Sequence, residues 1–285
     1  MLFRSGNLKR VFNQNKKSRI WEIDFLRGLP IIGLVLYHLG YDFIMLPYVF
    51  SNFYAMGNLG LQKFCYRVSL IMDSRLVDSL VPVFAGTFLL ICGISSSFSK
   101  NNIIRGLRIF AFGMLITLVT SIASYIIKED MIICFGILHC MGLTITIYGI
   151  LQWICRKLNI YIPDYVPFMV GLLIISIGMF IGNKGSFAYP IFNIKNLGKI
   201  ILGTIGSSTD WFPIFPWSGV IVAGISFGKW IYPEDKKQSL IPNMEFKVLK
   251  PISFIGRHTL LIYALHQVIF ISIFAMVLLP MGYKI

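Results

Sequence analysis

Residues 24–46 read DFLRGLPIIGLVLYHLGYDFIML and indicate the class of protein. The segment is apolar and long enough to cross the hydrocarbon core of a bilayer as one helix, which takes about 20 residues. The ionisable residues in it are Asp24, Arg27, His38 and Asp42. Arg27 and His38 are eleven positions apart, so at about 100° per residue their side chains point in nearly the same direction. Because ionisable groups inside a span are costly and usually line a functional cavity, this face of the helix is the predicted centre of the chemistry.

The composition of the chain is that of a membrane protein. Of its 285 residues, 56% are hydrophobic and 13% are charged, and the mean hydropathy is +0.75, whereas soluble domains carry about 25% charged residues. The segments long enough to span a bilayer are 24–46, 78–99, 104–127, 131–153, 166–183, 213–231 and 258–279. The sequence therefore predicts an all-α polytopic membrane helix bundle of about seven transmembrane helices. A basic cytoplasmic tail at 1–20 precedes a single transmembrane domain at 21–285.

The net charge of +14 is explained by membrane topology. With the N-terminus in the cytoplasm and the C-terminus outside, the cytoplasmic segments hold 18 of the 26 Lys and Arg residues, as the positive-inside rule requires. No basic groove with interleaved aromatic residues is apparent, so nucleic acid is not an expected partner. The five cysteines form no CxxC pair and have no metal-ligand spacing. We expect a multi-pass protein of the cell (plasma) membrane, in contact with lipid.

Two segments between the spans have patterns of their own. The outer loop 47–77 carries apolar residues at helical spacing, from Leu61 to Met72, with polar residues between them. This pattern predicts an amphipathic helix on the outer membrane interface, although a soluble cap over the bundle fits it as well. The stretch 191–206 is partly apolar but carries Lys195 and Lys199, which favours a re-entrant or interfacial piece over an eighth span.

Three of the four histidines fall near one depth. With a rise of about 1.5 Å per residue, His38, His139 and His266 all come close to the middle of a hydrophobic core about 30 Å thick. Asp42 lies one turn beyond His38, where a carboxylate could orient the imidazole or stabilise its charge. The candidate catalytic residues are therefore His38, Asp42, His139 and His266. A buried, hydrogen-bonded structural histidine is the alternative for His139 and His266.

A polar seam and an aromatic segment supply the candidate substrate-binding residues. The last span carries further polar side chains on the same arc as His266. The segment 210–217, DWFPIFPW, contains prolines that suit an extended lead-in to the sixth span near the outer surface. A helix cap for the acid and an interfacial belt for the aromatic residues are the alternatives. The candidates are Asp210, Trp211, Trp217, Tyr263 and Gln267.

Several stretches in order resemble the catalytic domain of the heparan-α-glucosaminide N-acetyltransferase family, in its short bacterial form. They are Arg19-Ile-Trp-Glu-Ile-Asp24-Phe-Leu-Arg27-Gly28, Phe135-Gly-Ile-Leu-His139-Cys-Met-Gly142, Asp210-Trp-Phe-Pro-Ile-Phe-Pro-Trp217 and Gly256-Arg-His-Thr-Leu-Leu-Ile-Tyr263-Ala-Leu-His266-Gln267. Arg27 and His38 also match the Arg-x10-His pattern of the wider membrane acyltransferase-3 group. The chain departs from the lysosomal members, which have asparagine at the position of His38 and their proposed active histidine at the position of Val49.

The resemblance implies an integral-membrane acyltransferase that moves an acetyl group from cytoplasmic acetyl-CoA to a hydroxyl or amine of an extracytoplasmic sugar or glycan. His38 would then act as the base or carry the acetyl group itself, and basic residues at the inner helix ends would hold the CoA phosphates. The candidate donor-binding residues are Arg27, Arg105, Arg108 and Arg257, and no metal is expected. A proton-coupled membrane transporter with a midplane His/Asp relay and a non-catalytic membrane assembly protein stay open as alternatives.

Overall fold

The structure, a computed structural model, describes residues 20–127, 132–182, 194–206, 210–233, 238–241 and 249–285. These residues form helices and no β-strand, which confirms the all-α prediction. The helices are α2 (Trp21–Val49), α3 (Leu59–Met72), α4 (Arg75–Ser97), α5 (Asn102–Ile127), α6 (Ile137–Lys157), α7 (Tyr165–Gly182), the short η1 (Ile194–Asn196), α8 (Leu197–Leu202), α9 (Ile214–Ile231), α10 (Leu249–Arg257) and α11 (Thr259–Leu278).

Within the described residues, α2, α4, α5, α6, α7, α9 and α11 are long and apolar enough to cross a membrane. The prediction of seven spans is therefore confirmed. Their ends alternate between two faces of the bundle. We call the face where α2 begins and α4 ends the basic face. At this face α9 contacts the residue before α7, with 2.7 Å between Nζ of Lys229 and Oδ1 of Asp164. Which face is cytoplasmic stays a prediction.

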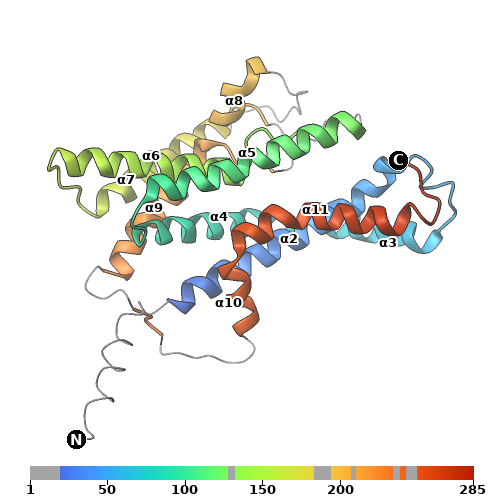
Figure 1. Cartoon of the computed structure of the whole chain (residues 1–285), viewed down its shortest axis with the longest axis horizontal. Helices are drawn as coiled ribbons and strands as arrows, with labels where there is room; N and C mark the ends of the chain where they lie inside the picture. The colour runs from blue at the N-terminus through green and yellow to red at the C-terminus, as the bar shows by residue number, and fades with distance from the viewer. Residues whose placement is uncertain (1–19, 128–131, 183–193, 207–209, 234–237, 242–248) are drawn as a thin grey trace, which may run out of the picture.

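The bundle has two parts. In Figure 1 the helices α5, α6 and α7 of one part lie above α2, α3 and α11 of the other. In one part α7 packs along α9, α5 along α6, and α4 along α9. In the other, α10, α3 and α11 pack on α2, which also contacts α4. Glycine allows the close approach of α2 and α10, because a Cβ on Gly28 would collide with the backbone carbonyl of Ile252 and a Cβ on Gly256 with that of Asp24. The two parts meet along α2, α4 and the start of α11.

The predicted amphipathic helix in the outer loop is present as α3. It packs on α2 through Phe64 and Phe43, whose ring centroids are 4.9 Å apart, and it buries Cys65. The C-terminal residues close the same end of the molecule, since the backbone amide of Ser51 donates to the carbonyl of Lys284 at 2.8 Å. Whether α3 lies on a membrane interface stays a prediction.

The described part of the stretch 191–206 contains η1 and α8, and residues 191–193 lie outside the described residues. With six residues, α8 is too short to span a bilayer. The extended lead-in to α9 is confirmed, because Pro213 and Phe215 have extended backbone angles and regular helix follows them. This lead-in passes beside the start of α6, where the backbone amide of Phe212 donates to the carbonyl of Phe135 at 3.3 Å.

Candidate active site

A cavity of about 520 Å³ lies between α2, α4, α5, α6 and the start of α11, and opens near the basic face. The described residues that line it include four cations and no carboxylate. These cations are Arg27, Lys100, Arg105 and Arg108. The structure thus brings together three of the four arginines predicted to bind the donor. We call this space the basic cavity.

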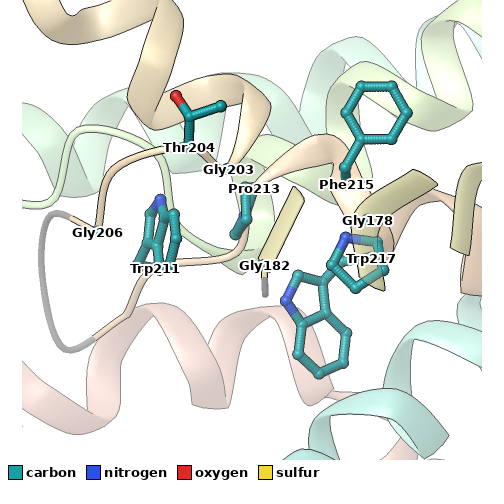
Figure 2. A pocket seen from close by; sticks show the side chains of 10 residues that line it. Gly178, Gly182, Gly203, Thr204, Gly206, Trp211, Pro213, Phe215 and Trp217 are labelled. Atoms are coloured by element: carbon teal, nitrogen blue, oxygen red, sulfur yellow. The ribbon is translucent and has the colours of Figure 1, made fainter. Parts of the chain in front are cut away.

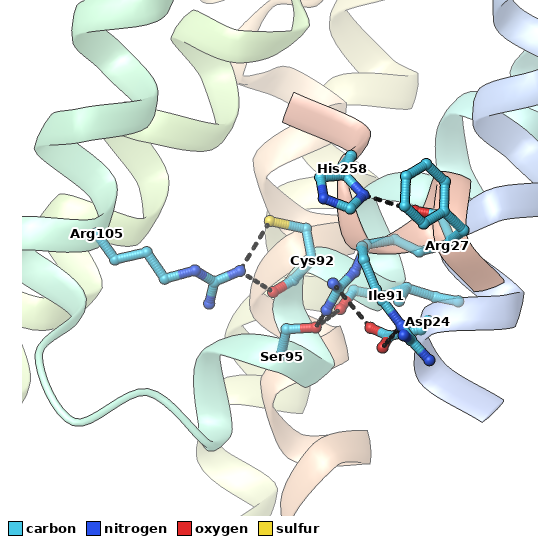
Figure 3. A network of polar contacts seen from close by, with 9 residues as sticks. Asp24, Arg27, Ile91, Cys92, Ser95, Arg105 and His258 are labelled. Atoms are coloured by element: carbon cyan, nitrogen blue, oxygen red, sulfur yellow. Dashed lines mark hydrogen bonds and ion pairs between the residues drawn. The ribbon is translucent and has the colours of Figure 1, made fainter. Parts of the chain in front are cut away.

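Arg27 is held at the wall of the basic cavity by two neighbours, which Figure 3 shows. Its Nη1 lies 3.6 Å from Oδ1 of Asp24, and its Nη2 donates to the Ser95 hydroxyl of α4. Arg257, the fourth predicted arginine, is not among the lining residues. Its Nε lies 3.4 Å from Oδ2 of Asp24, so one buried carboxylate joins α2 to the end of α10.

Arg105 enters the basic cavity from α5 and contacts α4 (Figure 3). Its Nη1 donates to Ser96 Oγ at 2.9 Å, and its Nη2 donates to the Cys92 carbonyl at 3.5 Å. Arg108 lies one turn further along α5 and is exposed. The cavity therefore offers two guanidinium groups that the protein holds, those of Arg27 and Arg105, and one, that of Arg108, that is open to an anionic ligand.

Two of the three predicted histidines meet between α2 and α11. The ring centroids of His38 and His266 are 5.0 Å apart. The Tyr263 ring lies 6.2 Å from that of His38 and 5.2 Å from that of His266. One turn further along α2, Asp42 accepts a hydrogen bond of 2.5 Å from Nε2 of Gln267. The polar stripe predicted on α2 thus faces the polar seam predicted on α11.

The hydrogen bonds of His266 fix its tautomer. Nδ1 lies 2.6 Å from the backbone carbonyl of Tyr263, and a carbonyl oxygen can only accept, so Nδ1 carries the proton. Nε2 is buried and has no hydrogen-bond partner among the described residues. In the neutral ring this nitrogen holds a free lone pair, which is what a base or nucleophile needs.

His139 lies in a different cluster from His38 and His266. Its Nδ1 accepts from the backbone amide of Gly136 at 3.1 Å, and its Nε2 lies 3.1 Å from Oγ1 of Thr117. The rings of Phe110 and Phe135 pack on it, each at 5.7 Å between centroids. Both ring nitrogens are therefore engaged by the protein, and a catalytic role for His139 stays an untested prediction.

Asp210 is buried, although the sequence predicts that its segment lies near the outer surface. Its Oδ1 accepts from the Tyr263 hydroxyl at 2.8 Å, and its carboxyl group also accepts from the backbone amide of Ile137. Burial raises the pKa of Asp210 from 3.8 to about 6. The reason for the inward position is room at Gly136, where a Cβ would lie 3.0 Å from the Asp210 carboxyl carbon.

The aromatic segment after Asp210 forms a second, smaller cavity of about 160 Å³ (Figure 2). We call it the aromatic pocket. Trp211 and Trp217 line it together with Phe215 and several glycines. The Trp211 indole is fixed, because its Nε1 donates to the backbone carbonyl of Ile200 at 3.0 Å. The predicted substrate residues Trp211 and Trp217 therefore share one cavity, while Asp210 and Tyr263 lie together beside the histidine pair.

A family model described as "Heparan-alpha-glucosaminide N-acetyltransferase, catalytic" matches residues 19–268. The chain belongs to this family. The resemblance seen in the sequence is thereby confirmed, and membership implies a membrane acetyltransferase. Neither a search of curated proteins nor a search of solved structures gave a match.

Sequence reasoning missed several residues that line the basic cavity of this acetyltransferase, among them Cys92, Lys100 and Thr259. Only Lys100 had a usable signal, since it lies in the short basic connection that also leads to Arg105 and Arg108.

Proposed function

We propose that the protein takes an acetyl group from acetyl-CoA bound in the basic cavity and transfers it to a hydroxyl or amine of a sugar or glycan on the opposite side of the membrane. In this proposal the basic face is cytoplasmic and the membrane is the plasma membrane. The observation that carries it is the basic cavity, with four cations and no carboxylate among its described lining residues. It lies beside the helix that carries His266.

The basic cavity suits the phosphate end of a nucleotide thioester. Arginine guanidinium groups bind phosphate oxygens through charge-assisted hydrogen bonds, and the low dielectric of a helix bundle strengthens them. Arg108 and Lys100 are exposed, so they are available to phosphates that arrive from the basic face. The lining also contains apolar side chains, among them Phe88 and Leu138, which suit the pantetheine arm.

One face of α11 connects the basic cavity to the histidine pair. Thr259, Tyr263 and His266 lie within an arc of about 60° on this helix, and Thr259 lines the cavity. A thioester that extends from the cavity along this face approaches His266. The aromatic pocket suits the acceptor, because aromatic rings stack on the apolar faces of sugars and Trp211 is adjacent in sequence to Asp210.

In the proposed chemistry, His266 Nε2 removes the proton from the acceptor hydroxyl or amine as that group attacks the thioester carbonyl carbon. The carbon–sulfur bond breaks, CoA leaves as the thiolate, and the proton passes from His266 to that thiolate. His38 makes no side-chain hydrogen bond with the described residues, so its N–H can stabilise the developing negative charge on the carbonyl oxygen. Asp42 lies one turn further along α2, and together with its partner Gln267 of α11 it fits the side of the acceptor.

The test uses the purified protein in lipid nanodiscs, with release of CoA thiol from acetyl-CoA as the readout. Glucosamine and N-acetylglucosamine serve as acceptor probes, because the first offers an amine and the second offers hydroxyls only. The variant His266→Gln should lower kcat at least a hundredfold, as loss of a general base does, whereas His258→Gln, on the exposed N-cap of α11, should not. Equal activity of both variants would refute the role of His266.

Donor binding is tested separately. Arg108→Gln should raise the KM for acetyl-CoA about tenfold, the scale of one charge-assisted contact, with little change in kcat. The matched control is Lys157→Gln, a basic residue at the end of α6 that packs over Trp153 and does not line the cavity. An unchanged KM in the Arg108 variant, or an equal rise of the KM in the control, would mean that the donor binds outside the basic cavity.

A further inference from the structure

The carboxyl group of Asp210 joins three segments that are far apart in the sequence. It lies in the turn before α9, it accepts from the Tyr263 hydroxyl of α11, and it accepts from the backbone amide of Ile137 at the start of α6. Only 4% of the residue is exposed. Because protein donors already occupy this carboxyl group, it is better placed to hold the protein together than to bind a substrate.

The hydrogen bond between Asp210 and Tyr263 is important because α11 has few other contacts with α6 and α9 among the described elements. Among the described elements, α11 packs mainly along α2. Tyr263 is buried, and its ring lies beside both His38 and His266. The hydroxyl bond to Asp210 therefore fixes the rotation of α11 relative to α6 and α9 at the level of the histidine pair.

Tyr263 also takes part in the hydrogen bonding of His266, the proposed base. The backbone carbonyl of Tyr263 accepts the Nδ1 proton of His266, which leaves Nε2 unprotonated. Because this contact lies within α11, a rotation of α11 would preserve it and would change the direction of Nε2 relative to His38. Positioning groups of this kind act by holding a reacting nitrogen in its productive geometry.

We infer that Asp210 is a positioning residue for acetyl transfer, which acts through the Tyr263 hydroxyl to hold Nε2 of His266 in its place beside His38. This inference rests on the proposed role of His266 as the base. It differs from a substrate-binding role for Asp210, in which the carboxylate would contact the acceptor and its loss would raise the KM for the acceptor.

The test is a double-mutant cycle of Asp210→Asn and Tyr263→Phe, two changes that preserve the size of the side chain. Each single variant should lower kcat about tenfold, the scale of one buried charge-assisted hydrogen bond, with the KM for acetyl-CoA unchanged. The double variant should be no slower than the slower single variant, because both changes remove the same contact. The matched control is Asp164→Asn, a carboxylate paired with Lys229 at the basic face, and its kcat should stay within twofold.

A second readout needs no activity. The chain has four histidines, so ¹⁵N-histidine labelling gives four imidazole pairs, and His266→Gln identifies the pair that belongs to His266. In the wild-type protein the nitrogen shifts of His266 should report protonated Nδ1 and unprotonated Nε2. In Asp210→Asn and Tyr263→Phe the nitrogen shifts of His266 should move, because its ring changes position beside His38, and in Asp164→Asn they should not.

Several outcomes would overturn the inference. Independent losses in the double variant, near a hundredfold together, would mean that Asp210 does not act through Tyr263. A raised KM for the acceptor probe with unchanged kcat would make Asp210 a binding residue. Unaltered nitrogen shifts of His266 in both variants would mean that the bond between Asp210 and Tyr263 is purely structural. If the wild-type protein releases no CoA thiol, the proposed function fails, while the nitrogen shifts still decide whether Asp210 controls the placement of His266.

Discussion

Replacing Asp24 by asparagine tests whether burial determines how much an ion pair contributes to the stability of this protein. The Asp24 carboxylate is 5% exposed and lies between two guanidinium groups, at 3.6 Å from Arg27 and 3.4 Å from Arg257. At an effective dielectric constant of about 20, each contact is worth about 5 kcal/mol of attraction. Desolvation offsets much of this, and the Arg257 side chain is 40% exposed. We therefore expect Asp24→Asn to lower the free energy of unfolding by about 3 kcal/mol, because it leaves two cations facing one another.

The assay is thermal unfolding of the purified protein in nanodiscs. A loss of about 3 kcal/mol corresponds to a fall in Tm of about 6–12 °C for a domain of this size. The control is Asp164→Asn, whose contact with Lys229 is shorter, at 2.7 Å between Nζ and Oδ1, but whose side chains are 28% and 47% exposed. An exposed pair contributes at most about 1 kcal/mol, so the control should lose no more than about 4 °C. If Tm falls equally in both variants, burial does not determine how much these ion pairs contribute to stability, and the reasoning is wrong.

Three further predictions concern packing and protonation. Gly256→Ala should destabilise the protein by about 2 kcal/mol, because its Cβ would collide with the α2 backbone at Asp24. By contrast, Gly198→Ala, which meets open space in α8, should be neutral or stabilising by up to about 1 kcal/mol in chemical unfolding. His139→Ala should lower the free energy of unfolding by about 3 kcal/mol, since it leaves a buried backbone amide unpaired and opens a cavity, while the kcat of the folded protein stays within twofold. Burial raises the pKa of Asp210 from 3.8 to about 6. The folded protein then binds the proton more tightly than the unfolded chain, and stability should fall by about 3 kcal/mol as pH rises from about 4 to about 6. In unfolding experiments across this range, Asp210→Asn should remove that fall, and an unchanged slope would exclude the assignment.

The spans could be predicted because the signal for each is local. A run of about 20 apolar residues must be helical to satisfy its backbone in lipid, whatever lies beside it. The proline-rich lead-in to α9 is local in the same sense, since Pro213 and Pro216 exclude regular helix before them. The match of residues 24–46 and 258–279 to α2 and α11, within a few residues at each end, follows from this rule.

The sequence could not predict which helices lie side by side in the bundle. The composition of the candidate site depends on that arrangement. Helical rise gave His38, His139 and His266 similar depths, but depth does not tell which helices are neighbours. His266 reaches His38 because α11 packs on α2, whereas His139 faces α5 and is engaged by Thr117. Asp210 could not be placed from sequence either, since its burial depends on the missing Cβ of Gly136, a contact between residues 74 positions apart.

The proposed chemistry assigns the role of base to His266 and not to His38. His38 stood out in the sequence because it shares a helix face with Arg27, yet among the described residues its ring has aromatic neighbours and no hydrogen-bond partner. A ring without a fixed partner can present either nitrogen as the donor, which suits an electrophilic role. His266 has one tautomer, set by a carbonyl three residues earlier on its own helix. A base must keep its lone pair at one atom through every turnover, so the histidine whose protonated nitrogen is fixed is the better base, and the one without such a constraint is the better donor.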